Sequence, residues 1–92
     1  MGLLIVYDVG DKSSIISLHR NLFGRIASLK DKRKYYYPGI LHDINYFKIK
    51  DGCYYIDKDI QLSDDVPVRT YRCNLDIDLD KFETGKDHWK KL

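Results

Sequence analysis

The segment 45–57 constrains the fold of this chain more than any other. Two runs rich in apolar and aromatic residues, 45–50 and 53–57, flank the dipeptide Asp51-Gly52. Asp-Gly supplies the positive φ angles that a tight turn between antiparallel strands requires, so the segment is predicted to form a β-hairpin. A sheet is therefore part of the fold.

Two segments before this hairpin predict a strand and a helix. Residues 3–7 form a continuous apolar run, which is typical of a central strand that is covered on both faces. Polar residues from Asp11 onward offer N-cap oxygens, and apolar residues then recur every three or four positions, which predicts a long helix over residues 13–30. Gly24 within it predicts a kink or a close packing contact. The apolar face of this helix consists of Ile15, Leu18, Leu22, Ile26 and Leu29.

The segments after the hairpin predict a loop, a strand and a short terminal element. Residues 58–66 are polar and predict a loop. Residues 68–79 alternate between apolar and polar and predict one long strand, bent near Cys73 where the parity of the apolar positions switches. Residues 81–92 are predicted to form a short helix or a loosely held tail, with Phe82 and Trp89 as docking residues.

This order of elements predicts a single small α+β domain over residues 1–92, with an antiparallel or mixed sheet covered by one long helix. A ferredoxin-like sandwich is the nearest architecture. Residues 58–66 lack the length and periodicity of its second helix, which favours a variant without that helix. Because a domain of this size buries only a modest share of its surface, we also expect a homodimer. No apolar run approaches the ~20 residues of a membrane span, so the chain is expected to be cytoplasmic, with no membrane contact.

Charge is unevenly distributed along the chain. The formal net charge is only +2, but residues 1–50 hold nine Lys/Arg against four Asp, whereas residues 51–92 hold seven against ten acidic residues. This asymmetry indicates a basic face that is available to a polyanion. The densest basic stretch, residues 25–34, leads directly into Tyr35, Tyr36 and Tyr37. A solvated helix end followed by a strand would give the same pattern.

The aromatic content supports a nucleic-acid interface. Eight of the 92 residues are tyrosines, and exposed tyrosines beside cations can stack on bases while the cations neutralise phosphates. Tyrosine also has high β-propensity, so the alternative interpretation is that these residues fill half-buried sheet surface or a dimer interface. The predicted nucleic-acid-binding residues are Arg25, Lys30, Lys32, Arg33, Lys34, Tyr36, Arg69 and Arg72.

The cysteines and histidines do not have the spacing that is typical of a zinc site or of a catalytic triad. Cys53 and Cys73 lack the spacing of zinc ligands and are interpreted as structural, with a disulfide between neighbouring strands left open. His19, His42 and His88 are scattered, and no catalytic triad can be argued from them.

The start of the chain resembles a known family. An apolar strand ends in Tyr7-Asp8, and a short Asp-containing link and an amphipathic helix follow. Over roughly residues 1–30 this pattern is similar to the small CRISPR-associated adaptation proteins, which are described as metal-dependent endonucleases. The resemblance implies a ferredoxin-like homodimer in which the Asp at the end of the first strand, here Asp8, lies near the dimer axis and binds Mg²⁺.

The chemistry of Asp8 is compatible with that role. Mg²⁺ prefers one or two carboxylates together with waters and phosphate oxygens, and the end of a buried strand is a suitable place for such a carboxylate. We therefore predict Asp8 as the catalytic and metal-binding residue, with Asp11 as a further oxygen donor of the same site. The alternative is that Asp8 caps the following turn or helix.

The sequence thus predicts a small nucleic-acid-binding homodimer with Mg²⁺-dependent phosphodiester cleavage centred on Asp8. One alternative is a nucleic-acid-binding module without catalysis. Another is a protein-interaction module whose Tyr-rich hairpin meets a partner by edge pairing or by aromatic anchors.

Overall fold

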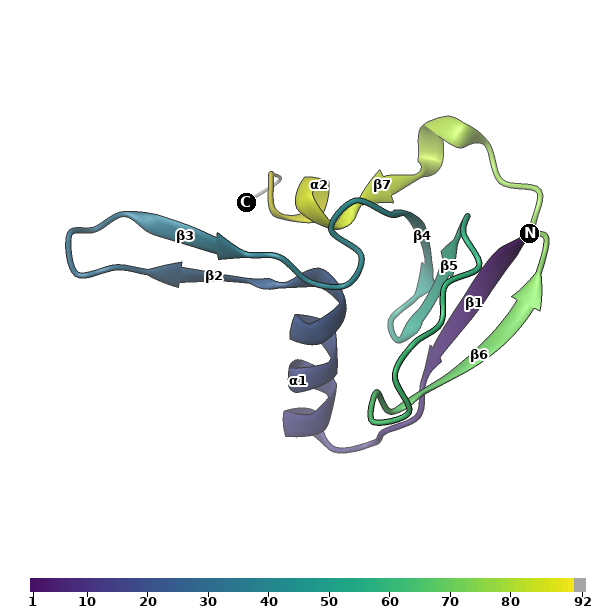
Figure 1. The fold of residues 1–92 in the computed structure, drawn as a ribbon, viewed down its shortest axis with the longest axis horizontal. Coiled ribbons are helices and arrows are strands. Elements are labelled where there is room, and N and C mark those ends of the chain that lie inside the picture. The colour runs from purple at the N-terminus through teal and green to yellow at the C-terminus, as the bar shows by residue number, and fades with distance from the viewer. Residues whose placement is uncertain (91–92) are drawn as a thin grey trace.

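A computed structural model describes the backbone of residues 1–90 and the side chains of residues 1–88 (Figure 1). The elements are β1 (Gly2–Tyr7), α1 (Lys12–Phe23), β2 (Arg25–Ser28), β3 (Lys34–Tyr37), β4 (Asn45–Lys50), β5 (Cys53–Ile56), β6 (Val68–Cys73), a 3-10 turn η1 (Leu79–Lys81), β7 (Glu83–Thr84) and α2 (Gly85–Lys90). Within the described residues the strands form a five-stranded antiparallel sheet, β6-β1-β5-β4-β7, and a separate two-stranded sheet, β2-β3. The predicted small α+β fold with an antiparallel sheet is therefore confirmed.

Strand β1 is central, as its apolar sequence predicts. It pairs with β5 on one side and with β6 on the other, so that Ile5 lies opposite both Tyr54 and Thr70. Alternate residues of β1 face α1, and the side chains of Leu3 and Ile5 are buried there. The core between α1 and this face of the sheet consists of Leu3, Ile5, Leu18, Leu22, Phe23, Leu41, Tyr46, Tyr54 and Ile56.

The predicted hairpin over residues 45–57 is confirmed. Strands β4 and β5 pair in antiparallel register, with a shift between Lys48 and Lys50. Gly52 in the turn has a φ of 80°, the left-handed conformation that glycine adopts without steric cost.

The predicted helix over residues 13–30 is wrong beyond Phe23. Gly24 follows α1 with φ 82° and ψ −168°, and its N–H donates to the Arg20 carbonyl oxygen at 2.7 Å. This region of backbone conformation is open essentially to glycine alone. Helix α1 therefore ends here and does not continue through a kink. The other prediction for Gly24, a close packing contact, is confirmed, because a Cβ at this position would overlap the carbonyl oxygen of Tyr37.

Residues 25–28 form strand β2 instead of two further helical turns. They pair with β3, so that Arg25 lies opposite Tyr37 and Ser28 opposite Lys34. Ile26 and Leu29, which matched the helical spacing, are 38% and 41% exposed. Their spacing was compatible with a helix. In this segment, however, the backbone forms the hydrogen bonds of the β2-β3 ladder instead of helical ones.

The predicted strand over residues 68–79 is shorter than expected. Its partner β1 begins at Gly2, which lies opposite Cys73, so the ladder between them has no partner backbone beyond that residue. Instead, the Tyr55 hydroxyl donates to the Cys73 carbonyl oxygen and accepts from the Leu75 N–H, both at 3.3 Å.

The C-terminal part of the described chain is ordered into η1, β7 and α2. The ring of Phe82 contacts those of Phe47 and Tyr55, which confirms its predicted docking role. The side chain of Trp89 and residues 91–92 lie outside the described structure.

Both cysteines are free in the described structure. Cys53 lies on β5 and Cys73 on β6, and β1 runs between these two strands. The open possibility of a disulfide between neighbouring strands is therefore not realised. Within residues 1–90, none of the helices has the length and apolar character needed to cross a membrane.

Candidate nucleic-acid interface and adjoining pocket

The β2-β3 hairpin projects from the rest of the molecule along its longest dimension, which measures 45 Å (Figure 1). The turn is closed by a 2.7 Å hydrogen bond from the Leu29 N–H to the Arg33 carbonyl oxygen, and Lys32 has a φ of 67°. Asp31 forms an ion pair with Arg33. Six of the eight predicted nucleic-acid-binding residues belong to this hairpin: Arg25, Lys30, Lys32, Arg33, Lys34 and Tyr36.

Two exposed tyrosines lie on β3, in the same hairpin as these basic residues. Tyr35 and Tyr37 are 50% and 40% exposed, and their ring centroids are 4.7 Å apart in an edge-on arrangement. The Arg25 guanidinium lies 4.4 Å from the centroid of the Tyr37 ring, which is a cation–π contact. One side of the hairpin thus combines aromatic rings with cations.

Tyr36 has a different environment. Its half-buried hydroxyl donates to the Phe23 carbonyl oxygen at 3.2 Å and lies 3.3 Å from His42 Nδ1. Tyr36 therefore fixes the hairpin to the body of the molecule. Its predicted contact with nucleic acid stays a prediction.

The fold does not place Arg69 and Arg72 beside the hairpin. They lie on β6, the opposite edge of the molecule in Figure 1, and on opposite faces of that strand. Each is in an ion pair: Arg69 Nε lies 3.4 Å from Asp8 Oδ2, and Arg72 Nε lies 3.0 Å from Asp59 Oδ2.

The two predicted magnesium ligands have separate partners. The side chain of Asp8 is 53% exposed and contacts Arg69. Asp11 is the N-cap of α1: its Oδ2 accepts from the Ser14 N–H at 3.0 Å and from the Ser13 hydroxyl at 2.9 Å. These hydrogen bonds, those from Ser14 first, lower the pKa of Asp11 to about 2.

The helix-capping role that the sequence left open for Asp8 thus belongs to Asp11. Among the residues that the structure describes, no group of three or more His, Cys, Asp or Glu side chains could hold a metal ion. Asp8 and Asp11 thus each have another partner within the chain, and the predicted Mg²⁺ site stays a prediction.

A cavity of about 1050 Å³ adjoins the base of the hairpin, bordered by α1, β4 and α2. Cations and two imidazoles line it alongside apolar side chains. The charged and imidazole groups that line it are His19, Arg20, Arg25, Lys48, Asp51, Lys81, Glu83 and His88.

His19 and His88 meet in this cavity, with ring centroids 5.4 Å apart. Tyr7 Oη lies 3.3 Å from His19 Nδ1, and Tyr46 Oη lies 3.3 Å from His88 Nδ1. The Phe23 ring contacts both imidazoles, at centroid distances of 4.5 and 5.0 Å. This is the cluster that sequence reasoning missed, because 69 positions separate the two histidines.

The environment alters the protonation of this cluster. Burial lowers the pKa of His19, and the neighbouring His88 adds to the shift. Burial also lowers the pKa of His88, with Lys48 as the second cause. Burial raises the pKa of Tyr7, and it raises the pKa of Tyr46 to about 12. At neutral pH the imidazoles are therefore largely neutral and both phenols keep their protons.

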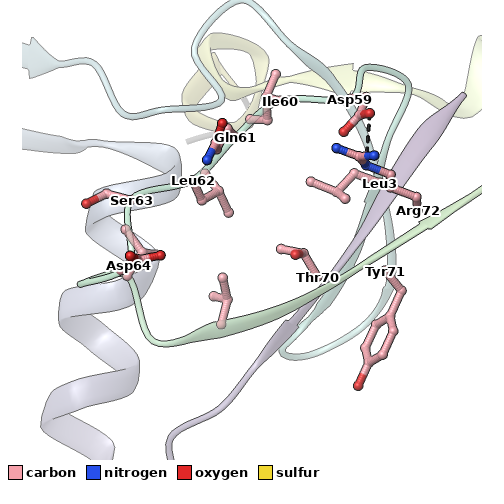
Figure 2. Close-up of a pocket in the computed structure, with 12 residues that line it drawn as sticks. Leu3, Asp59, Ile60, Gln61, Leu62, Ser63, Asp64, Thr70, Tyr71 and Arg72 are labelled. Atoms are coloured by element: carbon pink, nitrogen blue, oxygen red, sulfur yellow. Dashed lines mark ion pairs between the residues drawn. The ribbon is translucent and has the colours of Figure 1, made fainter.

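A second cavity, of about 900 Å³, lies between the loop after β5 and strand β6 (Figure 2). The ion pair between Asp59 and Arg72 spans one end of it. Apolar side chains such as Leu3 and Leu62 and polar ones such as Gln61 and Thr70 line the rest.

Comparison with protein-family models, with curated proteins and with solved structures found no match to this chain.

Proposed function

We propose that this protein binds nucleic acid and that the β2-β3 hairpin is its main contact surface. The observation that carries the proposal is the composition of this projecting element. Residues 25–37 hold five Lys/Arg side chains against one carboxylate, Asp31. Two exposed tyrosines, Tyr35 and Tyr37, belong to the same element.

Each part of the hairpin has a physical role in this proposal. The cations neutralise phosphates and release condensed counterions, which makes the affinity dependent on salt. Tyr35 and Tyr37 supply stacking surfaces, each worth about 1–3 kcal/mol per base. Arg69 and Arg72 lie at the far edge of the sheet and are neutralised by carboxylates, so we expect them to add less than the hairpin does.

The salt dependence of binding tests the role of the cations. We expect the triple variant Lys30→Gln, Lys32→Gln, Lys34→Gln to bind labelled single-stranded RNA or DNA more weakly. Its slope of log affinity against log salt should fall by about 2, since each phosphate contact on a single strand contributes about 0.7. A matched triple variant at Lys12, Lys58 and Lys86 removes the same charge outside the hairpin and should keep most of the slope.

The tyrosines are tested by truncation at constant charge. Tyr35→Ala and Tyr37→Ala should each weaken binding by about 1–3 kcal/mol, whereas Tyr35→Phe should retain it, because stacking needs the ring and not the hydroxyl. Salt-insensitive binding to a protein, with no affinity for polyanions, would contradict the proposal and favour a protein-interaction module.

A magnesium-dependent endonuclease of the CRISPR adaptation type is the second candidate. Two observations support it: the exposed carboxylate of Asp8 directly after β1, and the strand order β6-β1-β5-β4 with α1 between β1 and β4. In this candidate, that order is interpreted as a ferredoxin-like variant without the second helix. In this candidate the Asp8 carboxylates of two copies meet near the axis of a homodimer, so that the ion has two carboxylates beside waters and phosphate oxygens.

This candidate predicts cleavage that needs Mg²⁺, is stopped by a chelator and is lost in Asp8→Ala while binding remains. Sedimentation should show a dimer under the same conditions. Unchanged cleavage in Asp8→Ala, or an active monomer, would remove it.

A further inference from the structure

We propose that His19 and His88 form an acid–base pair that cleaves RNA without a metal ion, in the cavity at the base of the β2-β3 hairpin. The inference rests on the proposed function, since the hairpin is the element that would bring nucleic acid to this cavity. It names RNA as the substrate and the histidines as catalytic residues.

The geometry of the pair carries the inference. Two imidazoles with centroids 5.4 Å apart line the same cavity, so one phosphodiester group can contact both. Each ring has one nitrogen near a tyrosine hydroxyl and one face or edge against Phe23, which fixes its orientation. Fixed orientation is what a proton-transferring group requires.

The charge of the cavity suits an anionic substrate. Four cationic side chains line it against the carboxylates of Asp51 and Glu83. Lys48 Nζ lies 2.6 Å from Asp51 Oδ1, so its position is set by an ion pair. These cations are Arg20, Arg25, Lys48 and Lys81.

Arg25 connects the cavity to the proposed binding surface. It is the first residue of β2, contacts the exposed Tyr37 ring and also lines the cavity. A strand bound along the hairpin and stacked on Tyr37 would therefore place its next phosphates at the cavity. Binding and cleavage would then use adjacent parts of one surface.

The reaction needs no cofactor. The neutral imidazole accepts the proton of a ribose 2′-hydroxyl, and the 2′ oxygen forms a bond to the adjacent phosphorus. The bond from phosphorus to the 5′ oxygen breaks, its electron pair leaves with that oxygen, and the protonated imidazole of the pair donates a proton to it. The products are a 2′,3′-cyclic phosphate and a 5′-hydroxyl. DNA lacks the nucleophile and is not a substrate.

The pair can carry a single proton, on one of its two imidazoles. Adding a second proton is opposed by the like charge on the neighbouring ring. Because burial lowers the pKa of both rings, the singly protonated pair, and hence the highest rate, is expected below pH 6.5. The groups that act on the pair from neighbouring elements are Tyr7, Tyr46, Lys48, Asp51 and Glu83.

The test uses the full chain with labelled single-stranded RNA in excess chelator. Wild type should cleave it and leave 2′,3′-cyclic phosphate ends, while all-deoxy and 2′-O-methyl strands stay intact. His19→Gln and His88→Gln should each lower the rate about 100-fold or more and keep the affinity measured by fluorescence anisotropy. Gln61→Ala, on a polar residue outside this cavity, is the control and should cleave like wild type.

The outcomes separate this inference from the proposed function. Binding through the hairpin without chelator-resistant cleavage overturns the inference and leaves the proposed function standing. Chelator-resistant cleavage that survives the hairpin lysine variants at unchanged affinity overturns the proposed function but not the histidine pair. Ends with 5′-phosphates, or cleavage retained in both histidine variants, overturn the inference. The end chemistry is read on wild type, so the test holds even if a variant fails to fold.

Discussion

Gly24 shows how a single residue sets the end of an element. A Cβ at this position would overlap the carbonyl oxygen of Tyr37, and the φ of 82° is strained for any other residue. The close approach of the Tyr37 backbone is what joins the end of α1 to the base of the hairpin. The residue therefore determines both where the helix stops and where the hairpin begins.

Gly24→Ala should lower the free energy of unfolding by about 1–3 kcal/mol from backbone strain alone. Gly10→Ala is the matched control, because a Cβ there meets no atom within 4 Å, and we expect a change of no more than about 0.5 kcal/mol. Urea titrations of the two variants check this. Equal stabilities would show that α1 does not need a glycine at its end.

Asp11 acts at the other end of the same helix. Asp11→Ala removes the acceptor for the Ser14 N–H and should lower the melting temperature, whereas Asp11→Asn keeps an acceptor and should lower it less. The folded pKa of about 2 lies below the ordinary value of 3.8. The contribution of the carboxylate is therefore present above pH 4 and lost as the pH falls toward 2.

Melting curves of wild type and Asp11→Ala between pH 2 and pH 7 measure this contribution. The difference in melting temperature should shrink below about pH 4. A difference that stays constant over this range would contradict the role of the charged cap.

At the scale of elements, strand lengths in this molecule are set by their partners. Strand β6 stops where β1 begins, and the chain beyond it is held by the hydroxyl of Tyr55, a buried residue of β5. That hydroxyl bonds to the backbone on either side of Asn74, at Cys73 and Leu75. A local alternation of apolar residues carries no information about where a neighbouring strand begins.

Tyr55→Phe should therefore release the start of the segment after β6. We expect a loss of about 0.5–1.5 kcal/mol, because a partly buried N–H and a carbonyl lose a hydrogen-bond partner, and faster amide exchange at Leu75. Tyr35→Phe, on an exposed ring of the hairpin, should leave both unchanged. Unaltered exchange at Leu75 in Tyr55→Phe would show that other contacts hold the segment.

At the scale of the whole molecule, the fold creates a cluster that no local segment contains. Helices α1 and α2 are distant in sequence, and their packing brings His19 against His88 beside Phe23, a fully buried core residue. The two imidazoles are therefore coupled to the folding of the whole domain.

This coupling predicts a pH-dependent stability. The pKa values of both histidines lie below the ordinary 6.5 in the folded state, so the unfolded chain binds protons more readily. Stability should fall as the pH drops through about 6.5. The melting temperature of His19→Gln should depend less on pH between 7 and 5. A wild-type melting temperature that is flat over this range would contradict the burial of the pair.

The sequence by itself determined the features that depend on a few adjacent residues. The Asp51-Gly52 turn, the apolar run of β1 and the start of α1 at Asp11 were all predicted from local chemistry. Turn conformations, caps and burial patterns are properties of short segments, so the residues that carry them are visible in the sequence. The basic stretch before Tyr35 was visible for the same reason.

Only the tertiary structure decided where elements end and which distant residues meet. The spacing of Ile26 and Leu29 fits a helix, yet pairing between β2 and β3 places them in or beside a strand. His19 and His88 have no common pattern in the sequence, yet they share a cavity. The first outcome depends on backbone pairing between two short neighbouring strands, and the second on packing between helices at opposite ends of the chain. The apolar spacing within one segment reports neither contribution to the free energy of folding.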